Sequence, residues 1–573
     1  MKKKEQQYKR LLTPEGERLL TELASEKEQN PWNVYPRPHM RRESFFCLNG
    51  KWELSVGEEP SSWEEITVPF VPESVLSGIG RRLPDGAPLH YRKRFSLPEA
   101  LRDSRVLLHF DAVDSCAMVF LNGARLGGHC GGYERFTFDV TEQLREENLL
   151  TLRVTDALDG IFPYGKQKKK RGGMWYTPVS GIWQSVWMEA VPAAYIDALH
   201  VDSYADRAEV FVETVGMSAD GVAVVQLPDG ELTVPIRNGH GVIIPPDAPC
   251  WSPEDPYLYG MTVTVGDDTV ESYFALRGIE VGTVDGIPRL CLNGRSYFFN
   301  GLLDQGYFSD GIFLPASPEG YERDILAAKR LGFNTLRKHI KVEPELFYYA
   351  CDRLGMAVMQ DAVNNGSYSF LRDTALPTVG LRRRDDRRMH RDPVKRVAFL
   401  MGMARMVKSV RHHPSVVMYT VFNEGWGQFD HADAYRSLKK LDRTRLVDSV
   451  SGWFLPPKGQ TLYSDVESLH VYFKPFSMKE TGAYGKPVIL SEVGGYAWKV
   501  KDHSYQPKGE YGYRSFDSAE ALREAVERLY RTEILPAVEQ GLCAAIYTQL
   551  SDVEDEVNGL LTYDRQLSKL EKK

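Results

Sequence analysis

The stretch Val421-Phe-Asn-Glu-Gly-Trp-Gly427 continues an apolar run that begins at Val416. A second glutamate, Glu492, ends another apolar run, Pro487-Val-Ile-Leu-Ser-Glu492. Short apolar runs bounded by turn residues are typical of strands that are buried on both faces. We therefore expect Glu424 and Glu492 at the carboxyl ends of two buried strands.

The same kind of run recurs throughout the sequence after Gly282. The expected strands are Ser296–Phe299, Thr335–Arg337, Ala357–Gln360, Val416–Phe422, Leu446–Ser449, Ser468–Tyr472, Val488–Ser491 and Ala544–Gln549. The expected helices between them include Pro318–Leu331, Pro344–Leu354, Pro393–Arg411 and Ser518–Gln540. Proline at the start of several of them suits the first helical turn. Eight strands alternating with helices predict a (β/α)8 TIM barrel, whose sites lie at the carboxyl ends of the strands.

Both glutamates fall at such ends, on the fourth and seventh expected strands. Two carboxylates facing one pocket suit glycoside hydrolysis, because one can protonate the departing oxygen while the other attacks the sugar or activates water. Either glutamate alone is as easily an ordinary strand-end residue. The pair, in a barrel, favours a glycosidase.

The first half of the chain predicts two β-sandwiches ahead of the barrel. Residues 1–191 form an arm with a short helix and then a sandwich of jelly-roll type, in which Asn122-Gly123 marks a hairpin. Residues 192–281 alternate over shorter runs and suit an immunoglobulin-like sandwich. The barrel takes residues 282–573. The fold class is therefore multidomain, β followed by α/β.

Composition excludes several function classes. The net charge of -7 gives no support for nucleic-acid binding, and the basic residues between Lys166 and Arg171 are interpreted as a solvated loop. No window has the length and apolarity of a membrane span. No apolar core follows the basic N-terminus, so no secretory signal is expected. The seven scattered cysteines are interpreted as buried free thiols, which predicts a cytoplasmic location.

The chain resembles glycoside hydrolase family 2, the retaining exo-β-glycosidases that include β-galactosidases, β-glucuronidases and β-mannosidases. The resemblance covers nearly the whole chain in family order. It rests on Leu48-Asn-Gly-Lys-Trp52, His109-Phe-Asp111, Phe120-Leu-Asn-Gly123, Trp175-Tyr-Thr-Pro-Val-Ser-Gly-Ile-Trp183, Trp251-Ser-Pro-Glu-Asp-Pro-Tyr-Leu-Tyr259, and His413-Pro-Ser415 ahead of Asn423-Glu424.

The resemblance implies roles for the strand-end residues. Glu424, the glutamate of Asn-Glu, matches the acid/base, and Glu492 matches the nucleophile. Glu424 would need a raised pKa, which the negative charge of Glu492 would help to supply. Asn423 is expected to hydrogen-bond the sugar 2-hydroxyl.

Other residues near the strand ends are weaker candidates, and each has a plain structural role as its alternative. We expect Tyr472 to donate a hydrogen bond to the nucleophile, and His339 and His470 to line the sugar pocket. Arg337 either pairs with an active-site carboxylate or braces the barrel. Candidates for binding hydroxyls or stacking on the ring are Asp304, Asp361 and Trp498.

Departures from the family pattern bear on the sugar. No clear Asn-x-Lys-Gly, the pattern with which β-glucuronidases hold the sugar carboxylate, follows the eighth strand, and Asp552–Glu556 nearby is acidic. We therefore expect a neutral terminal sugar, galactoside-type first. A β-uronide, β-mannoside or pentoside (arabinoside) is the alternative, and Lys338 and Lys341 are the cations most able to favour a uronide. A non-catalytic carbohydrate-binding protein is the alternative from another class.

No cofactor and no catalytic metal is expected. The pair His412-His413 invites a metal interpretation, but neighbouring side chains at a helix end point in different directions, and Pro414 follows at once. No metalloprotease, P-loop or dinucleotide-binding motif is present. A structural Mg²⁺ or Na⁺ near the site and a homo-oligomer are left open. The expected partner is a small-molecule or oligosaccharide glycoside, with no nucleic acid and no membrane.

Overall fold

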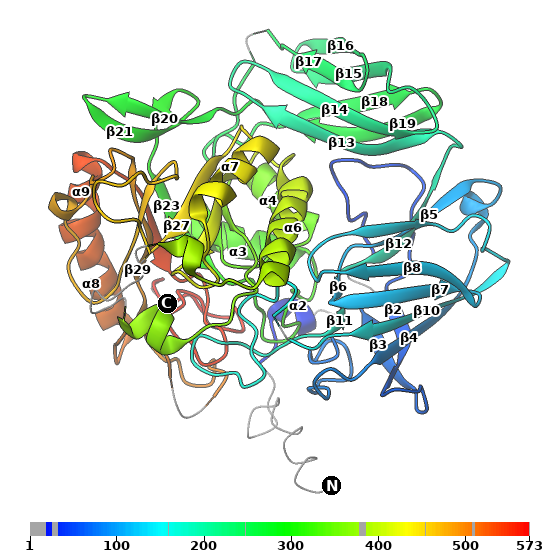
Figure 1. Cartoon of the computed structure of the whole chain (residues 1–573), viewed down its shortest axis with the longest axis horizontal. Coiled ribbons are helices and arrows are strands. Elements are labelled where there is room, and N and C mark those ends of the chain that lie inside the picture. Colours follow the sequence, from blue (N-terminus) through cyan, green and yellow to red (C-terminus); the bar gives the residue numbers. More distant parts are fainter. Residues whose placement is uncertain are drawn as a thin grey trace, which may run out of the picture.

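The computed structural model describes residues 19–25, 32–158, 160–246, 248–376, 385–452, 454–506 and 510–571. Two β-sandwiches lie against a barrel of parallel strands, the first at its side and the second across one end (Figure 1). The predicted fold class is confirmed. Most of the expected N-terminal arm lies outside the described residues, which contain the short helix α2, Glu22–Ser25.

The first sandwich consists of two main antiparallel sheets that pack around one core. The larger sheet has the order β3-β2-β4-β10-β7-β8, and its strands are Glu64–Val68, Gly50–Val56, Leu89–Ser96, Glu147–Thr155, Cys116–Leu121 and Ala124–Cys130. The other has the order β1-β12-β5-β9, with strands Phe46–Cys47, Val186–Val191, Arg105–Phe110 and Phe136–Asp139. A short ribbon pairs β11, Gly181–Ile182, with β6, Val113–Asp114. Alternate residues of β10 and β7 are buried, which is why their sequences alternate between apolar and polar.

The second sandwich is smaller and has the same two-layer form. One sheet has the order β13-β14-β17, with strands Tyr195–Ser203, Ala208–Val215 and His240–Ile243. The other has the order β16-β15-β18-β19, with strands Gly230–Ile236, Gly221–Leu227, Tyr259–Val265 and Asp268–Phe274. Their facing side chains form a separate hydrophobic core.

An antiparallel ribbon leads from this sandwich into the barrel. Its strands are β20, Ile279–Val284, β21, Ile287–Leu292, and β22, Arg295–Ser296. The predicted domain boundary after residue 281 falls inside β20, and the domain limits stay a prediction. The first barrel strand also begins later than predicted. The predicted Ser296–Phe299 spans the end of the ribbon, whereas β23 is Phe299–Asp304.

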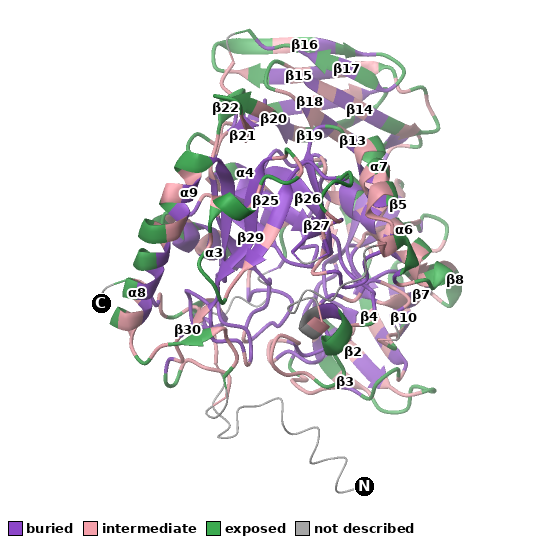
Figure 2. Ribbon diagram, turned by 60° about the vertical axis from the view of Figure 1, so that its left-hand side comes forward, coloured by how far each residue is buried: buried purple, intermediate pink, exposed green. Residues whose placement is uncertain are grey.

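The barrel sheet has the order β27-β26-β25-β24-β23-β32-β29-β28, and neighbouring strands in this order pair in parallel. Besides β23, its strands are β24 Thr335–Lys338, β25 Ala357–Asp361, β26 Val416–Asn423, β27 Leu446–Ser451, β28 Glu467–Val471, β29 Val488–Gly494 and β32 Leu542–Thr548. These strands are almost wholly buried (Figure 2). A short pair, β30 Tyr496–Ala497 and β31 Arg514–Ser515, lies outside the barrel sheet.

Helices surround the barrel between its strands. The α-helices are α3 Glu319–Arg330, α4 Glu345–Leu354, α6 Pro393–Val410, α7 His431–Leu441, α8 Ala519–Leu529 and α9 Leu535–Gln540. Single turns are η2 Glu99–Leu101, η3 Leu371–Ala375, η4 Asp386–Arg388, η5 Met478–Glu480 and η6 Tyr530–Ile534. The predicted helix Ser518–Gln540 is therefore α8 and α9 joined by the π-helical turn η6. Pro536 lacks a backbone N–H, which interrupts the regular helical hydrogen bonding.

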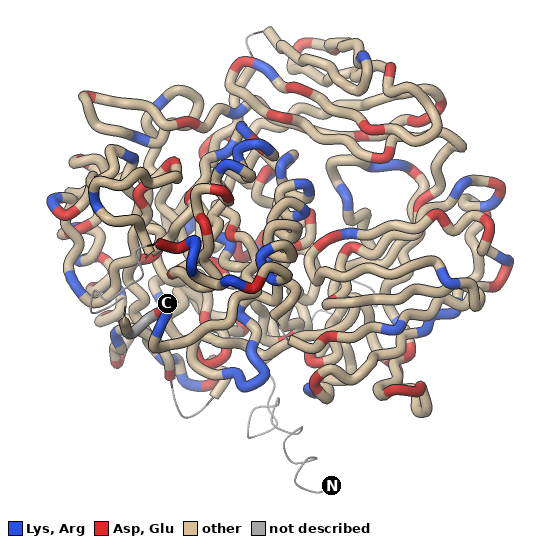
Figure 3. The backbone as a smooth tube through the Cα atoms, in the orientation of Figure 1, with Lys and Arg blue, Asp and Glu red and all other residues tan. Residues whose placement is uncertain are grey.

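The cysteine interpretation is partly wrong. Cys116 and Cys130 form a disulfide, because the hairpin at Asn122-Gly123 places them directly opposite each other on β7 and β8. Of the remaining cysteines, Cys47 and Cys250 are only half-buried. The expectation of a reducing cytoplasm therefore loses the support that seven free thiols would give it. Among the helices of the described residues, none combines the length and apolarity that crossing a membrane requires. Lys and Arg are scattered among Asp and Glu along the described chain, with a few continuous basic segments (Figure 3).

Candidate active site

The turn after β26 fixes the direction of the Glu424 side chain. The strand is buried up to Phe422, and Glu424 then takes a left-handed backbone with φ of 52°. Its N–H donates to the Ser451 carbonyl at the end of β27, at 2.8 Å. Gly425 follows with φ of 69°, and a Cβ there would collide with the Phe454 ring, so the turn needs glycine.

Glu492 lies on β29, across the barrel end from Glu424. A carboxylate oxygen of each glutamate and Nδ1 of His470 all lie within 4.8 Å of one another. Retaining glycosidases hold their two carboxyl groups about 5–5.5 Å apart, whereas inverting ones separate them by about 6.5–9.5 Å. The Glu424 side chain is 19% exposed and that of Glu492 5%. Glu424, the predicted proton donor to the departing oxygen, is thus the more exposed of the two carboxylates.

Three side chains hold the Glu492 carboxylate in place. Arg337 donates from Nη1 to Oε1 at 3.2 Å, and the Tyr472 hydroxyl donates to Oε2. Burial raises the pKa of Tyr472 well above its usual range, so this hydroxyl stays protonated as a donor. His470 Nδ1 lies 3.5 Å from Oε2. Tyr472 thus contacts Glu492 as expected, whereas His470, which was expected to line the sugar pocket, contacts both glutamates without lining it.

Arg337 combines both of its predicted alternatives. It pairs with Glu492 and also braces the barrel, because it is fully buried and donates to both Asp361 oxygens at 3.0 Å. It also donates to Asn423 Oδ1 at 2.9 Å. Burial lowers the pKa of Arg337, but the carboxylates of Asp361 and Glu492 raise it above its ordinary value. A permanent positive charge thus lies beside Glu492.

The expected raised pKa of Glu424 is wrong for this structure. Burial, the largest effect, raises the pKa of Glu424. The hydrogen bond and charge of His470, whose Nδ1 lies 2.8 Å from Glu424 Oε1, together with the charges of Lys166 and Arg337, outweigh it. The net pKa is therefore below the ordinary value. The other ring nitrogen of His470 lies 2.8 Å from the Ser451 hydroxyl, which orients the ring.

His339 lies beside the carboxylate pair. Its Nδ1 is 2.9 Å from Gln305 Oε1, and its Nε2 is 3.8 Å from both Asp361 and Glu492. Burial lowers the pKa of His339 well below its usual range, so the ring is neutral. His339 and Asn423 both line the pocket above the glutamates.

Besides His470, three residues that were expected to bind the sugar do not line this pocket. Asp361 is turned toward Arg337, as described above. Asp304 accepts from Lys338 Nζ at 2.6 Å in a buried cluster. Trp498 does not line the pocket; its carbonyl accepts from Lys569 at 2.8 Å. A place near a strand end does not determine where a side chain points, since strand-end residues can equally point between strands.

The two lysines that could favour a uronide, Lys338 and Lys341, form hydrogen bonds outside the pocket. Lys338 and Lys341 are both fully buried and donate to Glu343 Oε1, at 2.9 and 2.8 Å. Lys341 also donates to the carbonyls of Gly306 and Phe313. Neither lysine lines the pocket.

The pocket wall also includes a loop of the first sandwich, which was not predicted from the sequence. Lys166, Met174 and Trp175 line it, although they precede the barrel by more than a hundred residues. Lys168–Lys170 are exposed as expected, but Lys166 is half-buried, so the solvated-loop interpretation is wrong for Lys166. Further lining residues from the barrel are Leu303, Gln305, Ile340, Tyr368, Trp426, Tyr513, Thr548 and Glu556.

The acidic segment after β32 contributes one carboxylate to the pocket. Asp552 is paired with Lys569 at 2.7 Å, and Glu554 with Arg171 at 3.3 Å. Glu556 lines the pocket and accepts hydrogen bonds from Tyr176 and, at 3.5 Å, Gln549. Burial raises the pKa of Glu556, and the charge of Lys166 acts in the opposite direction.

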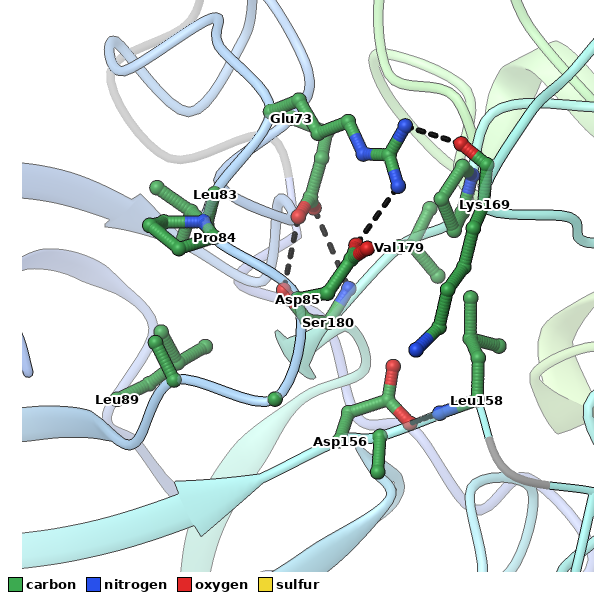
Figure 4. A pocket seen from close by; sticks show the side chains of 15 residues that line it. Glu73, Leu83, Pro84, Asp85, Leu89, Asp156, Leu158, Lys169, Val179 and Ser180 are labelled. Atoms are coloured by element: carbon green, nitrogen blue, oxygen red, sulfur yellow. Dashed lines mark hydrogen bonds and ion pairs between the residues drawn. The ribbon is translucent and has the colours of Figure 1, made fainter. Parts of the chain in front are cut away.

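A second small pocket lies in the first sandwich and is separate from the carboxylate pair. Its Glu73 accepts from the Ser180 hydroxyl at 2.8 Å, while Lys169 extends toward Asp156 (Figure 4). It shares no lining residue with the pocket above the glutamates.

Comparison with known proteins finds two family models that match separate parts of the chain. The family model for the glycosyl hydrolases family 2 TIM barrel domain matches residues 289–505, and that for the glycosyl hydrolase 2 galactose-binding domain-like region matches residues 84–183. These matches cover more than half of the chain. The chain belongs to glycoside hydrolase family 2.

Curated relatives of this family member are distant. A β-galactosidase of Thermoanaerobacter pseudethanolicus is 26% identical over 394 residues, which are 63% of this chain and 48% of that protein. A β-glucuronidase of Rattus norvegicus is 25% identical over 446 residues, 68% of this chain and 65% of the rat protein. The chain spans about half the length of several curated relatives that it matches.

Solved structures share the fold along nearly the whole chain. A β-D-glucuronidase of Dictyoglomus thermophilum has a TM-score of 0.72 at 18% identity and covers 94% of this chain and 97% of its own. A β-glucuronidase of Ruminococcus gnavus has a TM-score of 0.75 at 17% identity, covering 95% and 98%. At this identity the likeness concerns the fold.

Proposed function

We propose that this family 2 protein is a retaining exo-β-glycosidase that works by double displacement. The observation that carries the proposal is the approach of Glu424 and Glu492, whose oxygens lie within 4.8 Å at the carboxyl ends of β26 and β29. A non-catalytic binding protein would have no use for two such close like charges, since bringing them together disfavours ionisation of both.

Glu492 acts as the nucleophile in the first step. Its carboxylate attacks the anomeric carbon while Glu424 gives its proton to the glycosidic oxygen, so that the aglycone leaves as an alcohol. In the second step Glu424, now ionised, takes a proton from water, and the resulting hydroxide displaces Glu492 from the sugar. Both glutamates return to their initial states, and net retention follows from two inversions.

The surrounding groups suit these roles. Arg337 and Tyr472 hold Glu492 by charge and hydrogen bond, which fixes the position of its carboxylate for attack. Arg337 also occupies Asn423 Oδ1, which leaves the Asn423 amide N–H groups as the side that faces a sugar 2-hydroxyl. Hydrogen bonds to that hydroxyl strengthen in the transition state of such enzymes.

A neutral sugar of galactoside type is the first proposal for the substrate. Three carboxyl groups line the pocket, those of Glu424, Glu492 and Glu556, and a uronate would bring a further acidic group among them. Glu556 accepts hydrogen bonds and so fits hydroxyl donors of a neutral sugar. A β-uronide is the second candidate, because Lys166 places one cation in the same pocket. Mannosides and pentosides lack an observation in their favour.

Kinetics on a panel of nitrophenyl β-glycosides test this proposal. We expect kcat/KM for the β-galactoside to exceed that for the β-glucuronide, and Lys166→Met to leave this order unchanged. A higher kcat/KM for the glucuronide that is lost in Lys166→Met would instead establish the uronide. No turnover of any β-glycoside would contradict the reaction class.

The acid/base role has a separate test. Glu424→Ala should slow glycosides with poor leaving groups far more than activated aryl glycosides, since the acid contributes roughly 10²–10⁴-fold. Azide should restore turnover with a β-glycosyl azide as product. Absence of that product would move the acid role to another residue.

A cytoplasmic location and a homo-oligomer remain proposals. Cys116 and Cys130 offer the test of location, because the cytoplasm keeps cysteine thiols reduced and would leave this pair without its disulfide. Trapping thiols in intact cells would report whether this pair is reduced.

A further inference from the structure

Three segments from different parts of the chain meet at a cavity of about 690 Å³ away from the paired glutamates. The N-terminal arm contributes His39, the first turn of α4 contributes Glu345, and His412 follows the end of α6. Both sandwiches also line this cavity. In Figure 1, α6 lies on the side of the barrel that faces the first sandwich.

These three side chains place three potential ligand atoms together. His39 Nδ1 lies 2.6 Å from Glu345 Oε2, and His412 Nε2 lies 3.9 Å from the same oxygen. All three atoms are within 4.8 Å of one another. The rings of His39 and His412 are stacked with centroids 3.5 Å apart, so their orientations are fixed together.

His412 has a buried nitrogen that nothing in the described protein satisfies. The residue is 4% exposed, and its Nε2 has no hydrogen-bond partner among the described residues. Burying a polar atom without a partner costs about 1–3 kcal/mol. Its neighbour His413 differs, because His413 Nδ1 is 2.6 Å from Asp352 and 3.0 Å from the Tyr273 hydroxyl. The unsatisfied atom of His412 instead faces Glu345.

We propose that His39, Glu345 and His412 form a binding site for a divalent transition metal of the Zn²⁺ type. Two imidazole nitrogens and one carboxylate oxygen are a ligand set that Zn²⁺ takes, with water at the fourth position. Ligands about 2.0–2.1 Å from a tetrahedral ion lie roughly 3.3 Å from each other. The observed spacings of 2.6 and 3.9 Å bracket that value.

The electrostatics of the three groups suit metal binding. Arg135 Nη2 forms an ion pair with Glu345 Oε1 at 3.0 Å, which leaves Oε2 toward the histidines. The positive charge of Arg135 is offset by Asp111 at 2.5 Å.

A metal here would connect the arm to the barrel and take no part in the sugar chemistry. The site joins residue 39, ahead of the first sandwich, to α4 and to the segment after α6. A ligand that binds only the folded chain stabilises it. The expected absence of a catalytic metal is a separate question, because this site shares no residue with the carboxylate pair.

Titration of the chelator-treated protein with ZnCl2, followed by calorimetry, tests the proposal. We expect one equivalent bound with a Kd below about 1 μM and a higher Tm with zinc. His39→Gln and His412→Gln should each weaken binding at least about 10-fold, the lower end of what even supporting residues contribute. His200→Gln is the matched control, because His200 lines the same cavity outside the cluster.

A positive signature accompanies these losses. With Co²⁺ in place of zinc, His39→Cys should add a thiolate-to-metal absorption band, since cysteine thiolate is also a ligand of such sites. Circular dichroism checks that each variant is folded. Zinc binding that is equal in all variants, that is lost equally in the His200→Gln control, or that is weaker than about 10 μM in the wild type would overturn the site.

Discussion

The hydrogen bond between His470 and Glu424 determines how readily Glu424 is protonated. The net pKa of Glu424 is lowered, so the protonated acid is lost as pH rises through that depressed value. Replacing His470 by leucine removes the partner that lowers this pKa. We expect the basic limb of the kcat/KM profile to move to higher pH in His470→Leu, with a lower maximum because Ser451 and Glu492 also lose a neighbour.

The leaving group supplies the control for this pH experiment. A glycoside with a strongly activated aryl group needs little protonation, so its basic limb should move much less than that of an alkyl glycoside. If both substrates kept the wild-type limb in His470→Leu, the limb would belong to a group other than Glu424.

The sequence predicted the position of several site residues at the barrel end for a clear reason. Glu424, Asn423, His470, Tyr472 and Glu492 lie at or just after the ends of apolar runs, so their place followed from the strand assignment. Residues at equivalent strand ends differ in whether their side chains point into the pocket, and a single sequence does not encode that direction. Asp304 and Asp361 thus point toward Lys338 and Arg337.

At the scale of single elements, the turn that holds Glu73 in the first sandwich should make stability depend on pH. Burial raises the pKa of Glu73 to about 8, above its ordinary 4.5. The folded state therefore keeps a proton that the unfolded chain loses, so this contribution is full below pH 4.5 and is lost as pH rises through 8. We expect Glu73→Gln to be less sensitive to pH than the wild type across this window, by at most about 5 kcal/mol.

Thermal unfolding of both proteins at pH 5 and pH 8.5 measures this effect. The difference in Tm between wild type and Glu73→Gln cancels the titration of groups common to both. An unchanged difference at the two pH values would contradict a buried, protonated Glu73.

Errors in element prediction have local physical causes. The first barrel strand was placed at 296–299 because Gly301 interrupts the apolar pattern of β23. Gly301 is required there, since a Cβ would meet Ile546 and Thr335 of the neighbouring strands. The Cys116–Cys130 pair depended on the register of one hairpin, which the turn Asn122-Gly123 indicates only once both strands are assigned.

At the scale of the whole molecule, the first sandwich completes the wall of the barrel pocket. Trp175 packs edge-on against Trp426 and Tyr368 of the barrel, with ring centroids 5.0 and 4.9 Å apart. Sequence spacing gave no signal for this contact, because more than two hundred residues separate Trp175 from Trp426. The domain arrangement, not a local pattern, brings them together.

We expect Trp175→Ala to raise KM about 10-fold with a smaller effect on kcat, because the side chain shapes the pocket without touching Glu424 or Glu492. A factor of ten corresponds to about 1.4 kcal/mol, within reach of a lost aromatic pair and its buried area. Trp63→Ala is the matched control, because Trp63 packs on Arg92 in the same sandwich. Equal effects of the two variants would mean that Trp175 acts through sandwich stability alone.

Identification of the covalent intermediate tests the central claim most directly. The enzyme is treated with the activated 2-deoxy-2-fluoro analogue of its best β-glycoside, digested, and mapped by mass spectrometry. We expect one equivalent of sugar on the peptide that contains Glu492, and neither label nor turnover in Glu492→Gln. A label on another residue, or turnover that survives in Glu492→Gln, would contradict Glu492 as the nucleophile of a retaining glycosidase.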